Sequence, residues 1–273
     1  KLETGKPLAA PTAPSLLMAS SSWASVPPCS GTGHSSSVSL INFFFASFDH
    51  RGFVSIDKPP LGLWIQTLFA LILGFKPWVL RLPQALAFAG SVLLIYSIVK
   101  KHNGQVTGLI AALILTFSPV FLAVSRTNNL EALLILILLG GTRLLFEAAD
   151  RKSIPLLLGA VALVGAGFNI KMLQAFMVLP AFFLLACQAF REKKKFPVKP
   201  FLLSALVLCV VSFAWIITVD LTPEEKRPYV GGSFTNSAIE LAIGYNGIAR
   251  LLPLPAGMMG TGDTPPGNKS PGE

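Results

Sequence analysis

Long apolar runs alternate with short polar linkers along most of the chain. The runs occupy residues 80–99, 106–124, 132–149, 154–170, 172–190 and 200–219. Each is close to the roughly 20 residues that an α-helix needs to cross the hydrocarbon core of a bilayer. The pattern therefore predicts an all-α, polytopic integral membrane protein, with about six transmembrane helices in a membrane domain over residues 80–219.

A shorter apolar run, Leu61 to Phe75, comes before the first of these segments. Its length of about 15 residues is too short to span a bilayer. Trp64 lies in this run and Trp78 follows it, and tryptophan is enriched at the membrane–water interface. We expect an interfacial helix there, stopped by Lys76-Pro77, within an outer loop that covers residues 41–79.

The two ends of the chain lack such runs. Residues 1–40 form an atypical low-complexity tail rich in Ser, Pro, Ala and Gly, and residues 251–273 are rich in Gly and Pro. Such compositions bury too little apolar surface to fold, so we expect both tails to be disordered. A further outer loop is expected over residues 220–250.

The composition and charge pattern support the membrane assignment. Only 13% of the residues are charged, whereas a soluble domain carries about 25%. The net charge of +9 does not indicate a nucleic-acid partner, because the basic residues lie between apolar runs instead of forming a stripe. They gather in alternate linkers, at Lys100-Lys101-His102, Arg151-Lys152 and residues 193–199. These linkers are expected to face the cytoplasm, and the others to face outward.

The first outer linker combines acids, a lysine and prolines in an otherwise apolar chain. Asp49 lies near its start, and Asp57-Lys58 come directly before Pro59-Pro60. A proline keeps the residue before it extended, so this acid and base do not belong to a solvated helix face. Asp57 and Lys58 are therefore candidate site residues, with Asp49 beside them.

Two further outer linkers each present charged side chains. Arg126 and Glu131 lie on either side of a short polar turn, and Lys171 is a single cation at a tight turn. Glu131 has two interpretations, which are a carboxylate at a helix N-terminus and a catalytic acid. The charged residues of 224–227 are interpreted as part of a solvated loop.

Acids and cations at an outer membrane surface suit the transfer of a group from a lipid-linked phosphate. A cation offsets the charge of the leaving phosphate, and a carboxylate takes the proton of the acceptor hydroxyl. A transporter could use the same residue types, so this alternative stays open. His34, His50 and His102 are scattered, which predicts no structural metal. Within one span, Arg143 and Glu147 lie four residues apart and are expected to pair.

Several distinctive sequence motifs lie between residues 42 and 250. They are Phe48-Asp49, Gly52-Phe53-Val54-Ser55-Ile56-Asp57-Lys58-Pro59-Pro60-Leu61-Gly62, Arg81-Leu82-Pro83-Gln84, Asn128-Asn129-Leu130-Glu131, Asn169-Ile170-Lys171, Asp220-Leu221-Thr222-Pro223, Arg227-Pro228-Tyr229-Val230-Gly231 and Gly244-Tyr245-Asn246-Gly247. Taken together, they resemble the bacterial family 39 glycosyltransferases. These are GT-C membrane enzymes related to protein O-mannosyltransferases and lipid A aminoarabinose transferases.

The resemblance implies a glycosyltransferase of the bacterial plasma membrane with its active site on the outer face. Its donor would be a hexose-type, mannose-like sugar on a polyprenyl phosphate, and its acceptor a hydroxyl of a lipid, glycan or protein. Transfer would invert the configuration of the sugar. The resemblance implies membrane lipid as a partner and allows a divalent metal ion at the acidic outer loop.

The resemblance also suggests roles for single residues. The acid of the Asp57-Lys58 element lies in the active site of the family, and Lys58 contacts the donor phosphate. Lys171 matches a second phosphate-facing lysine, and Arg126 is a further candidate for that role. Glu131 matches a second outer-loop acid, which is usually Asp in the family. Glu131 and Asp49 would both assist Asp57 in catalysis.

One departure from the family pattern concerns the N-terminus. The family has a first membrane span and an outer helix with an acid before this point, whereas here the composition changes abruptly near Ser39. We therefore expect a truncated or frame-shifted stretch over the first forty residues. Two alternatives to an active transferase stay open. One is a membrane transporter or flippase, and the other is an inactive fragment that binds the donor lipid.

Overall fold

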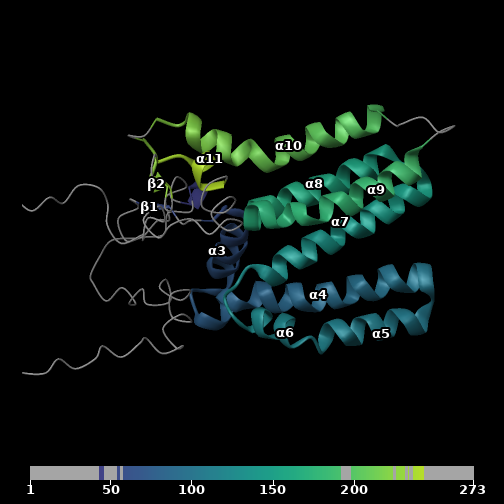
Figure 1. Ribbon diagram of the computed structural model, residues 1–273. Helices are drawn as coiled ribbons and strands as arrows, with labels where there is room; N and C mark the ends of the chain where they lie inside the picture. The colour runs from purple at the N-terminus through teal and green to yellow at the C-terminus, as the bar shows by residue number, and fades with distance from the viewer. Residues whose placement is uncertain are drawn as a thin grey trace, which may run out of the picture. The chain divides into compact units, whose positions relative to one another are not determined.

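Helices that run beside one another make up most of the described chain (Figure 1). The computed structural model describes residues 43–45, 54–55, 58–191, 198–223, 226–230, 233 and 236–242. The two tails expected at residues 1–40 and 251–273 lie outside this part of the chain. The elements are β1 (Val54–Ser55), α3 (Leu61–Leu73), α4 (Pro77–Asn103), α5 (Gln105–Thr116), α6 (Pro119–Arg126), α7 (Glu131–Arg151), α8 (Ile154–Lys171), the 3₁₀ helix η1 (Met172–Val178), α9 (Leu179–Phe190), α10 (Val198–Leu221), β2 (Tyr229–Val230) and α11 (Ala238–Glu240).

Four stretches of the described chain are long and apolar enough to cross a membrane. They are Pro77–Asn103, Glu131–Arg151, Ile154–Phe190 and Val198–Leu221, and the bent pair of α5 and α6 would make a fifth. The all-α, polytopic membrane architecture is therefore confirmed, with four or five spans by length and composition against about six expected.

The difference in number arises at Ile154–Phe190, which the chain uses for two passes along the bundle. Lys152, just before this stretch, donates a hydrogen bond from Nζ to the carbonyl oxygen of Ala189 near its end. The two ends therefore lie together, so the chain must reverse between them. The reversal occurs at Met172, whose φ of 46° is rare for a residue with a side chain. This is one residue after the turn expected at 169–171.

The helices α5 and α6 form a bent pair, with an angle of 58° between them. Pro119 is the first residue of α6, and it lacks the N–H group that would continue the hydrogen bonds of α5. The bend keeps α6 against α4, where Phe121 packs on Phe88 with ring centroids 4.9 Å apart. The span expected over residues 106–124 is therefore made of two helices that meet at this bend.

Glycines allow close contact between neighbouring helices. A Cβ on Gly141 of α7 would lie 3.1 Å from the carbonyl oxygen of Ala160 on α8. A Cβ on Gly165 of α8 would lie 3.0 Å from the Cβ of Val211 on α10. Small residues at such contacts let helix backbones approach, which supplies packing energy where lipid offers no hydrophobic gain.

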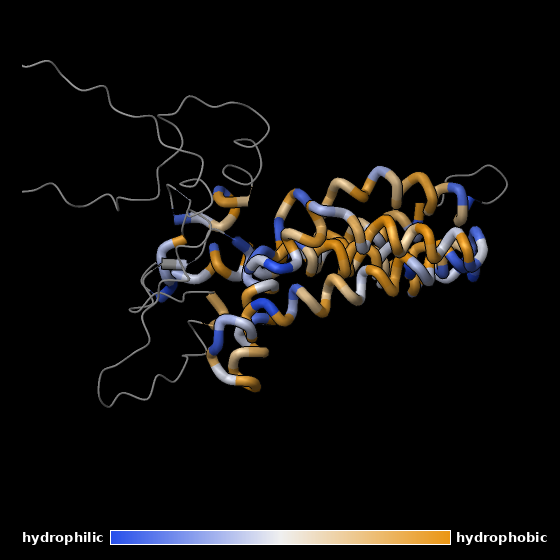
Figure 2. The backbone as a smooth tube through the Cα atoms, turned by 90° about the horizontal axis from the view of Figure 1, so that it is seen from below, coloured by the Kyte–Doolittle hydropathy of each residue, from blue (hydrophilic) through white to orange (hydrophobic). Residues whose placement is uncertain are grey.

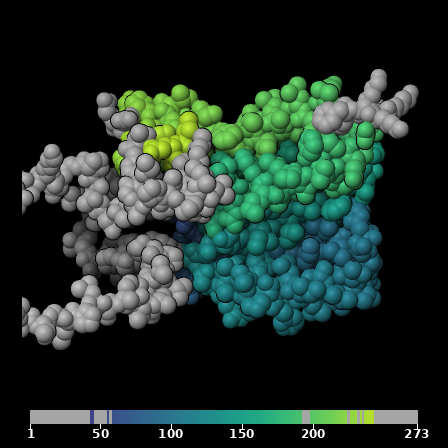
Figure 3. Space-filling model, viewed as in Figure 1, coloured from purple at the N-terminus to yellow at the C-terminus, as the bar shows by residue number. Residues whose placement is uncertain are grey.

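Apolar side chains also cover much of the outer surface of the helices. On and after α5, Val106, Ile114 and Phe117 are between 69% and 75% exposed. In water such a surface would drive association, whereas lipid tails solvate it. Figure 2 shows this distribution, because the helices are mainly orange along their length and blue residues gather near their ends. Of these first helices, α4 and α6 contact α7, and the space-filling view shows the continuous surface that results (Figure 3).

The expected pair within α7 is replaced by two other contacts. Arg143 donates from Nη1 to the hydroxyl oxygen of Ser97 on α4, over 2.6 Å. Glu147 forms its ion pair with Arg151, one turn further along the helix, at 3.6 Å. Arg143 therefore joins two helices, because its long side chain reaches across the seam between α4 and α7.

We predict that Gly108→Ala destabilises the hairpin of α4 and α5. The new Cβ would lie 3.0 Å from the backbone carbonyl oxygen of Tyr96 and 3.0 Å from the amide nitrogen of Lys100, and backbone atoms cannot rotate away. We expect the free energy of unfolding in detergent to fall by about 1–2 kcal/mol, because overpacking outweighs the gain in helix propensity.

Gly140→Ala is the matched control for this prediction. Its Cβ would meet only the Cδ1 atom of Leu163, at 3.4 Å, so its stability should be unchanged or slightly higher. Equal thermal unfolding midpoints for the two variants would contradict the close contact of α4 and α5.

Candidate functional site

The charged linkers are sorted to opposite ends of the helix bundle. At one end, Lys101 of α4 forms an ion pair with Asp150 of α7, with 2.7 Å between Nζ and Oδ2. Lys152 reaches Ala189 at this same end. The alternate basic linkers therefore do lie together. The opposite end holds Glu131 and Lys171, which the sequence analysis assigned to the other set.

Glu131 and Lys171 form an ion pair at this second end. Lys171 Nζ donates to Glu131 Oε1, and the side chain of Gln174 donates to Oε2 over 3.4 Å. The side chains of Lys171 and Glu131 are only 15% and 23% exposed, so water screens the pair weakly. Glu131 is thus held through both of its carboxylate oxygens.

The helix topology explains why these two residues meet. Glu131 is the first residue of α7 and Lys171 is the last residue of α8. Since α7 and α8 are consecutive, antiparallel helices, the start of one lies beside the end of the other. Gly167 lies one turn below Lys171, and a Cβ there would be 3.2 Å from Leu134 Cδ1 on α7. This close packing holds the two charged ends together.

The N-terminus of α3 lies against the polar turn before Glu131. A Cβ on Gly62 would lie 2.7 Å from Leu130 Cδ1, so the two elements touch. The buried Gln66 donates from Nε2 to the Oδ1 atom of Asn128 over 2.6 Å. These contacts place the start of α3, just after Lys58, beside the start of α7.

Lys58 and Arg126 lie at this end without an ion pair to another described residue. Lys58 is partly exposed beside the buried Pro59 and Pro60, and Arg126 is exposed at the last position of α6. Both cations are accessible to an anion. Of the expected site residues, the structure therefore brings together Glu131 and Lys171, with Lys58 on the neighbouring element.

The two aspartates of the first outer linker, Asp49 and Asp57, lie outside the described residues. The structure does describe the chain on either side of Asp57. Ser55 pairs in a parallel ladder with Val230 of β2, and Pro59 is buried. Ser55 and Pro59 are therefore each held by contacts or burial in the described fold.

Sequence reasoning missed a second polar centre at this end. Arg227, interpreted as part of a solvated loop, has a side chain only 5% exposed and forms an ion pair with Asp220 at 3.2 Å. The spacing of these two residues across a proline offers no helical or strand periodicity, so pattern alone could not pair them. Gln66 could have been recognised only by its position, since it is the single amide side chain in the apolar helix α3.

Two apolar cavities lie beside α10. One, of about 340 Å³, lies between α3, α8 and α10 and is lined by residues that include Leu61, Trp64, Asn169, Trp215 and Thr218. Leu61 comes three residues after Lys58, and Asn169 comes two residues before Lys171. This cavity therefore lies next to the charged cluster.

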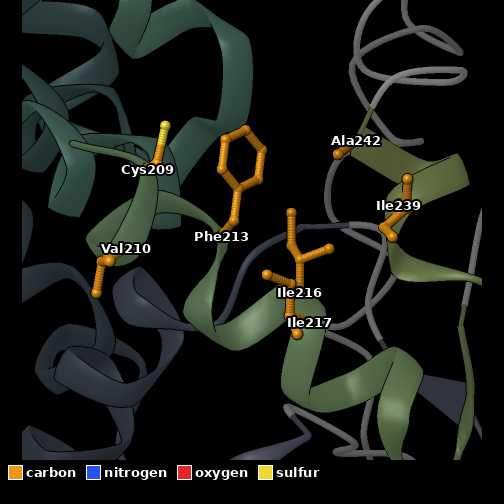
Figure 4. Close-up of a pocket in the computed structure, with 7 residues that line it drawn as sticks. All are labelled: Cys209, Val210, Phe213, Ile216, Ile217, Ile239 and Ala242. Atoms are coloured by element: carbon orange, nitrogen blue, oxygen red, sulfur yellow. The ribbon is translucent and has the colours of Figure 1, made fainter. Parts of the chain in front are cut away.

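The other cavity, of about 390 Å³, is lined by Cys209, Val210, Phe213, Ile216, Ile217, Ile239 and Ala242. Figure 4 shows the α10 residues on one side and Ile239 with Ala242 on the other. All of these side chains are apolar apart from the thiol of Cys209. This cavity can hold apolar groups, but it has no acid–base pair.

The described residues contain no group of three or more His, Cys, Asp or Glu that could hold a metal ion. Glu131 is the one acid of the expected site within this part of the chain, and its carboxylate is already engaged by Lys171 and Gln174. The described residues alone therefore do not form a metal site.

These features define a class, that of helical, multi-pass membrane proteins with a charged site at one end of the bundle. Comparison with known proteins narrows it. A model of the family "Dolichyl-phosphate-mannose-protein mannosyltransferase" matches residues 57–217. The chain belongs to this family of GT-C membrane glycosyltransferases, as its motifs predicted.

Two curated relatives come from Bacillus subtilis (strain 168). "Putative mannosyltransferase YycA" is 50% identical over 214 residues, which cover 78% of this chain and 31% of that protein. "Putative mannosyltransferase YkcB" is 50% identical over 217 residues, which cover 78% of this chain and 30% of that protein. The chain thus spans about a third of the length of these relatives. No solved structure matches.

We predict that Glu131 and Lys171 are energetically coupled. Removing one partner leaves a poorly hydrated charge, whereas removing both does not. In a double-mutant cycle with Glu131→Gln and Lys171→Met, we expect a coupling free energy of about 0.5–3 kcal/mol from thermal unfolding in detergent.

The pair of Glu147 and Arg151 is the control for this cycle. Arg151 is 69% exposed, and an exposed pair on one helix contributes only about 0.3–0.5 kcal/mol. Additive effects of Glu131→Gln and Lys171→Met would show that the two side chains do not interact.

Proposed function

We propose that this chain transfers a mannose-like hexose from a polyprenyl-phosphate donor to an acceptor hydroxyl at the outer face of the bacterial plasma membrane. The observation that carries the proposal is the contact of Glu131 with Lys171 and Gln174. It lies beside the element that leads from Asp57-Lys58 into α3, in a chain of a mannosyltransferase family.

The outward orientation follows from the charges at the opposite end. In the sequence, the linkers of that end carry two acids, Asp150 and Glu192, against a larger number of cations, which are Lys100, Lys101, Arg151, Lys152, Arg191, Lys193, Lys194, Lys195 and Lys199. Short linkers with an excess of Lys and Arg remain in the cytoplasm. The end with Glu131 and Lys171 would then face outward.

The donor phosphate would bind between Lys58 and Lys171. The ammonium group of Lys171 can donate three hydrogen bonds, and Glu131 receives one of them. Lys58, without an ion pair among the described residues, can contact the same phosphate from the start of α3. Two cations would stabilise the negative charge that grows on the phosphate as the sugar leaves.

The apolar cavity of about 340 Å³ supports a lipid-linked donor. It lies beside the charged cluster and is lined mainly by apolar and aromatic side chains such as Leu61, Trp64 and Trp215. A phosphate at Lys58 and Lys171 would place the first isoprene units of a polyprenyl chain at this cavity. A soluble nucleotide-sugar donor has no apolar chain that this cavity could bind.

The reaction needs one base and a stabilised leaving group. The acceptor oxygen would attack C1 of the sugar from the face opposite the phosphate, so a new C1–O bond forms as the C1–O bond to the phosphate breaks. The acceptor proton would pass to Asp57, and polyprenyl phosphate would leave. Glu131 is engaged by Lys171 and Gln174, so its role would be to hold Lys171 in place, which leaves Asp57 as the base.

The structure does not favour a transporter. Transporters bind their substrates at broken helices near the middle of the membrane, and α5–α6 is a broken pair. However, Phe117 and Val120 at the break are 75% and 74% exposed, so apolar side chains there face outward. The polar residues lie instead at the end of the bundle.

We predict that Asp57→Asn and Lys58→Met each reduce transfer by about a hundredfold or more, because one removes the base and the other a phosphate contact. The measurement is the movement of radiolabelled mannose from polyprenyl-phosphate mannose to an acceptor fraction, with the full chain in bacterial membrane vesicles. Asp150→Asn and Lys199→Met are matched controls, because these residues lie at the opposite end.

Membrane content of each variant, measured by immunoblot, should equal that of the unmodified chain. Transfer at the unmodified rate by Asp57→Asn would remove that residue from the mechanism. Sugar transfer absent from the unmodified chain, with uptake of the donor lipid or sugar into vesicles instead, would contradict the proposed function as a whole.

A further inference from the structure

Arg227 connects three separate segments at the outer end of α10. Its Nη1 atom forms the ion pair with Asp220, at 3.2 Å, and also donates to the carbonyl oxygen of Val219. Its Nη2 atom donates to the carbonyl oxygen of Asn236 over 2.7 Å. The planar guanidinium group makes all these contacts at once, which a lysine ammonium on a flexible stem could not reproduce.

Asp220 uses both carboxylate oxygens in the same network. Oδ1 accepts from the backbone N–H of Ala238 over 2.7 Å. Oδ2 accepts from the hydroxyl of Ser237 over 2.8 Å and from the backbone N–H of Ile239 over 3.1 Å. One carboxylate therefore fixes residues 237–239 to the last turn of α10.

A third residue, Asn236, carries this restraint to β2. Its side-chain Oδ1 atom accepts from the backbone N–H of Val230 over 2.8 Å. Its φ of 55° shows that the backbone adopts a left-handed turn at this point. Val230 is the strand residue that pairs with Ser55 of β1, so the network ends at the strand before Asp57-Lys58.

We propose that Asp220 and Arg227 are positioning residues for Lys58. They act through Asn236 and the β2–β1 ladder, which hold β1 against the end of α10. This inference rests on the proposed transferase function, since it assigns the two residues a role at the same site. It adds a contact network that sets the place of the first phosphate-binding lysine.

The position of the network separates this role from general stability of the bundle. All its members lie in the last turn of α10 and in the segments from Arg227 to Ile239. The packing of α7, α8 and α9 depends instead on glycine contacts and on the apolar cluster around Leu145, Ala160 and Phe182, which contains no residue of the network. Loss of the ion pair should therefore free β2 and β1 while the helices stay packed.

The first test measures the ladder directly and needs no activity. Ser55→Cys and Val230→Cys are introduced together in the full chain, with Cys29, Cys187 and Cys209 replaced by Ala. Paired residues of neighbouring strands lie within the range of a disulfide, so mild oxidation should link them. We expect Asp220→Asn or Arg227→Gln to slow this cross-link about tenfold, because the restraint on β2 opens locally.

Asp150→Asn is the matched control, because it breaks an ion pair of 2.7 Å at the opposite end of the bundle. It should leave the rate of cross-linking unchanged. Equal rates in all four proteins would overturn the inference, because the ladder would then not depend on Asp220 and Arg227. Since no transfer is measured, failure of the proposed function leaves this result unaffected.

The second test compares KM with maximal rate, using polyprenyl-phosphate mannose as the donor. A smaller folded fraction lowers the maximal rate without changing KM, whereas a displaced Lys58 raises the KM for the donor. We expect Asp220→Asn and Arg227→Gln to raise the donor KM about tenfold, as displacement of a binding group by about 1 Å allows. Arg227→Lys should recover only part of this loss, because it keeps the charge but not the fork.

An unchanged donor KM with a lower maximal rate would show that the two residues only stabilise the fold. Slower cross-linking together with a raised KM supports the positioning role. Slower cross-linking in a chain without any transfer would confirm the restraint and would contradict the proposed function, so the two failures are distinguishable.

Discussion

The cost of placing a charge in hydrocarbon determines where chemistry can occur in this protein. A bilayer stabilises helices whose backbone groups are satisfied internally and whose outer side chains are apolar, and it excludes unpaired ions from its centre. In the described helices, the charged residues accordingly lie at or near the two ends of the bundle, and Arg143 donates to Ser97 on the side of the basic end. The site can lie only at an end of the bundle or on a segment attached to it.

The two ends use their charges differently. At the basic end, cations exceed acids, and the ion pair of Lys101 with Asp150 is partly exposed. At the other end, Lys171 and Arg227 are largely buried and each is matched to one acid. Exposed pairs add little stability, whereas partly buried and geometrically matched pairs fix side chains in place. The second end therefore holds its charged side chains in fixed positions, as the proposed transferase site requires.

The sequence was sufficient for the architecture because a membrane imposes strong rules on length and charge. The apolar runs predicted the all-α membrane fold, and the alternation of Lys and Arg predicted which linkers share an end. The motifs predicted the family. Local features depended on other information: the bend before Pro119 and the reversal at Met172 are backbone details inside or beside continuous apolar runs.

The site was only partly predictable for a related reason. Glu131, Lys171, Lys58 and Arg126 could be proposed one linker at a time, since each stands out as a charge beside an apolar run. The partner of each residue could not, because the pairing of Glu131 with Lys171 depends on how the ends of α7 and α8 align. Arg227 was misinterpreted because its partners are backbone carbonyl oxygens and Asp220. No regular spacing in the sequence predicts these contacts.

The most direct measurement of the central claim is the location of the bound donor. A polyprenyl-phosphate mannose with a photoreactive group near the phosphate is bound to the full chain in membranes, irradiated, and the modified peptides are identified by mass spectrometry. We expect adducts on the start of α3 and on α10, around Leu61, Trp64 and Trp215, which line the cavity beside Lys58 and Lys171. Adducts confined to α5 or to the basic end near Lys101 and Lys152 would contradict it.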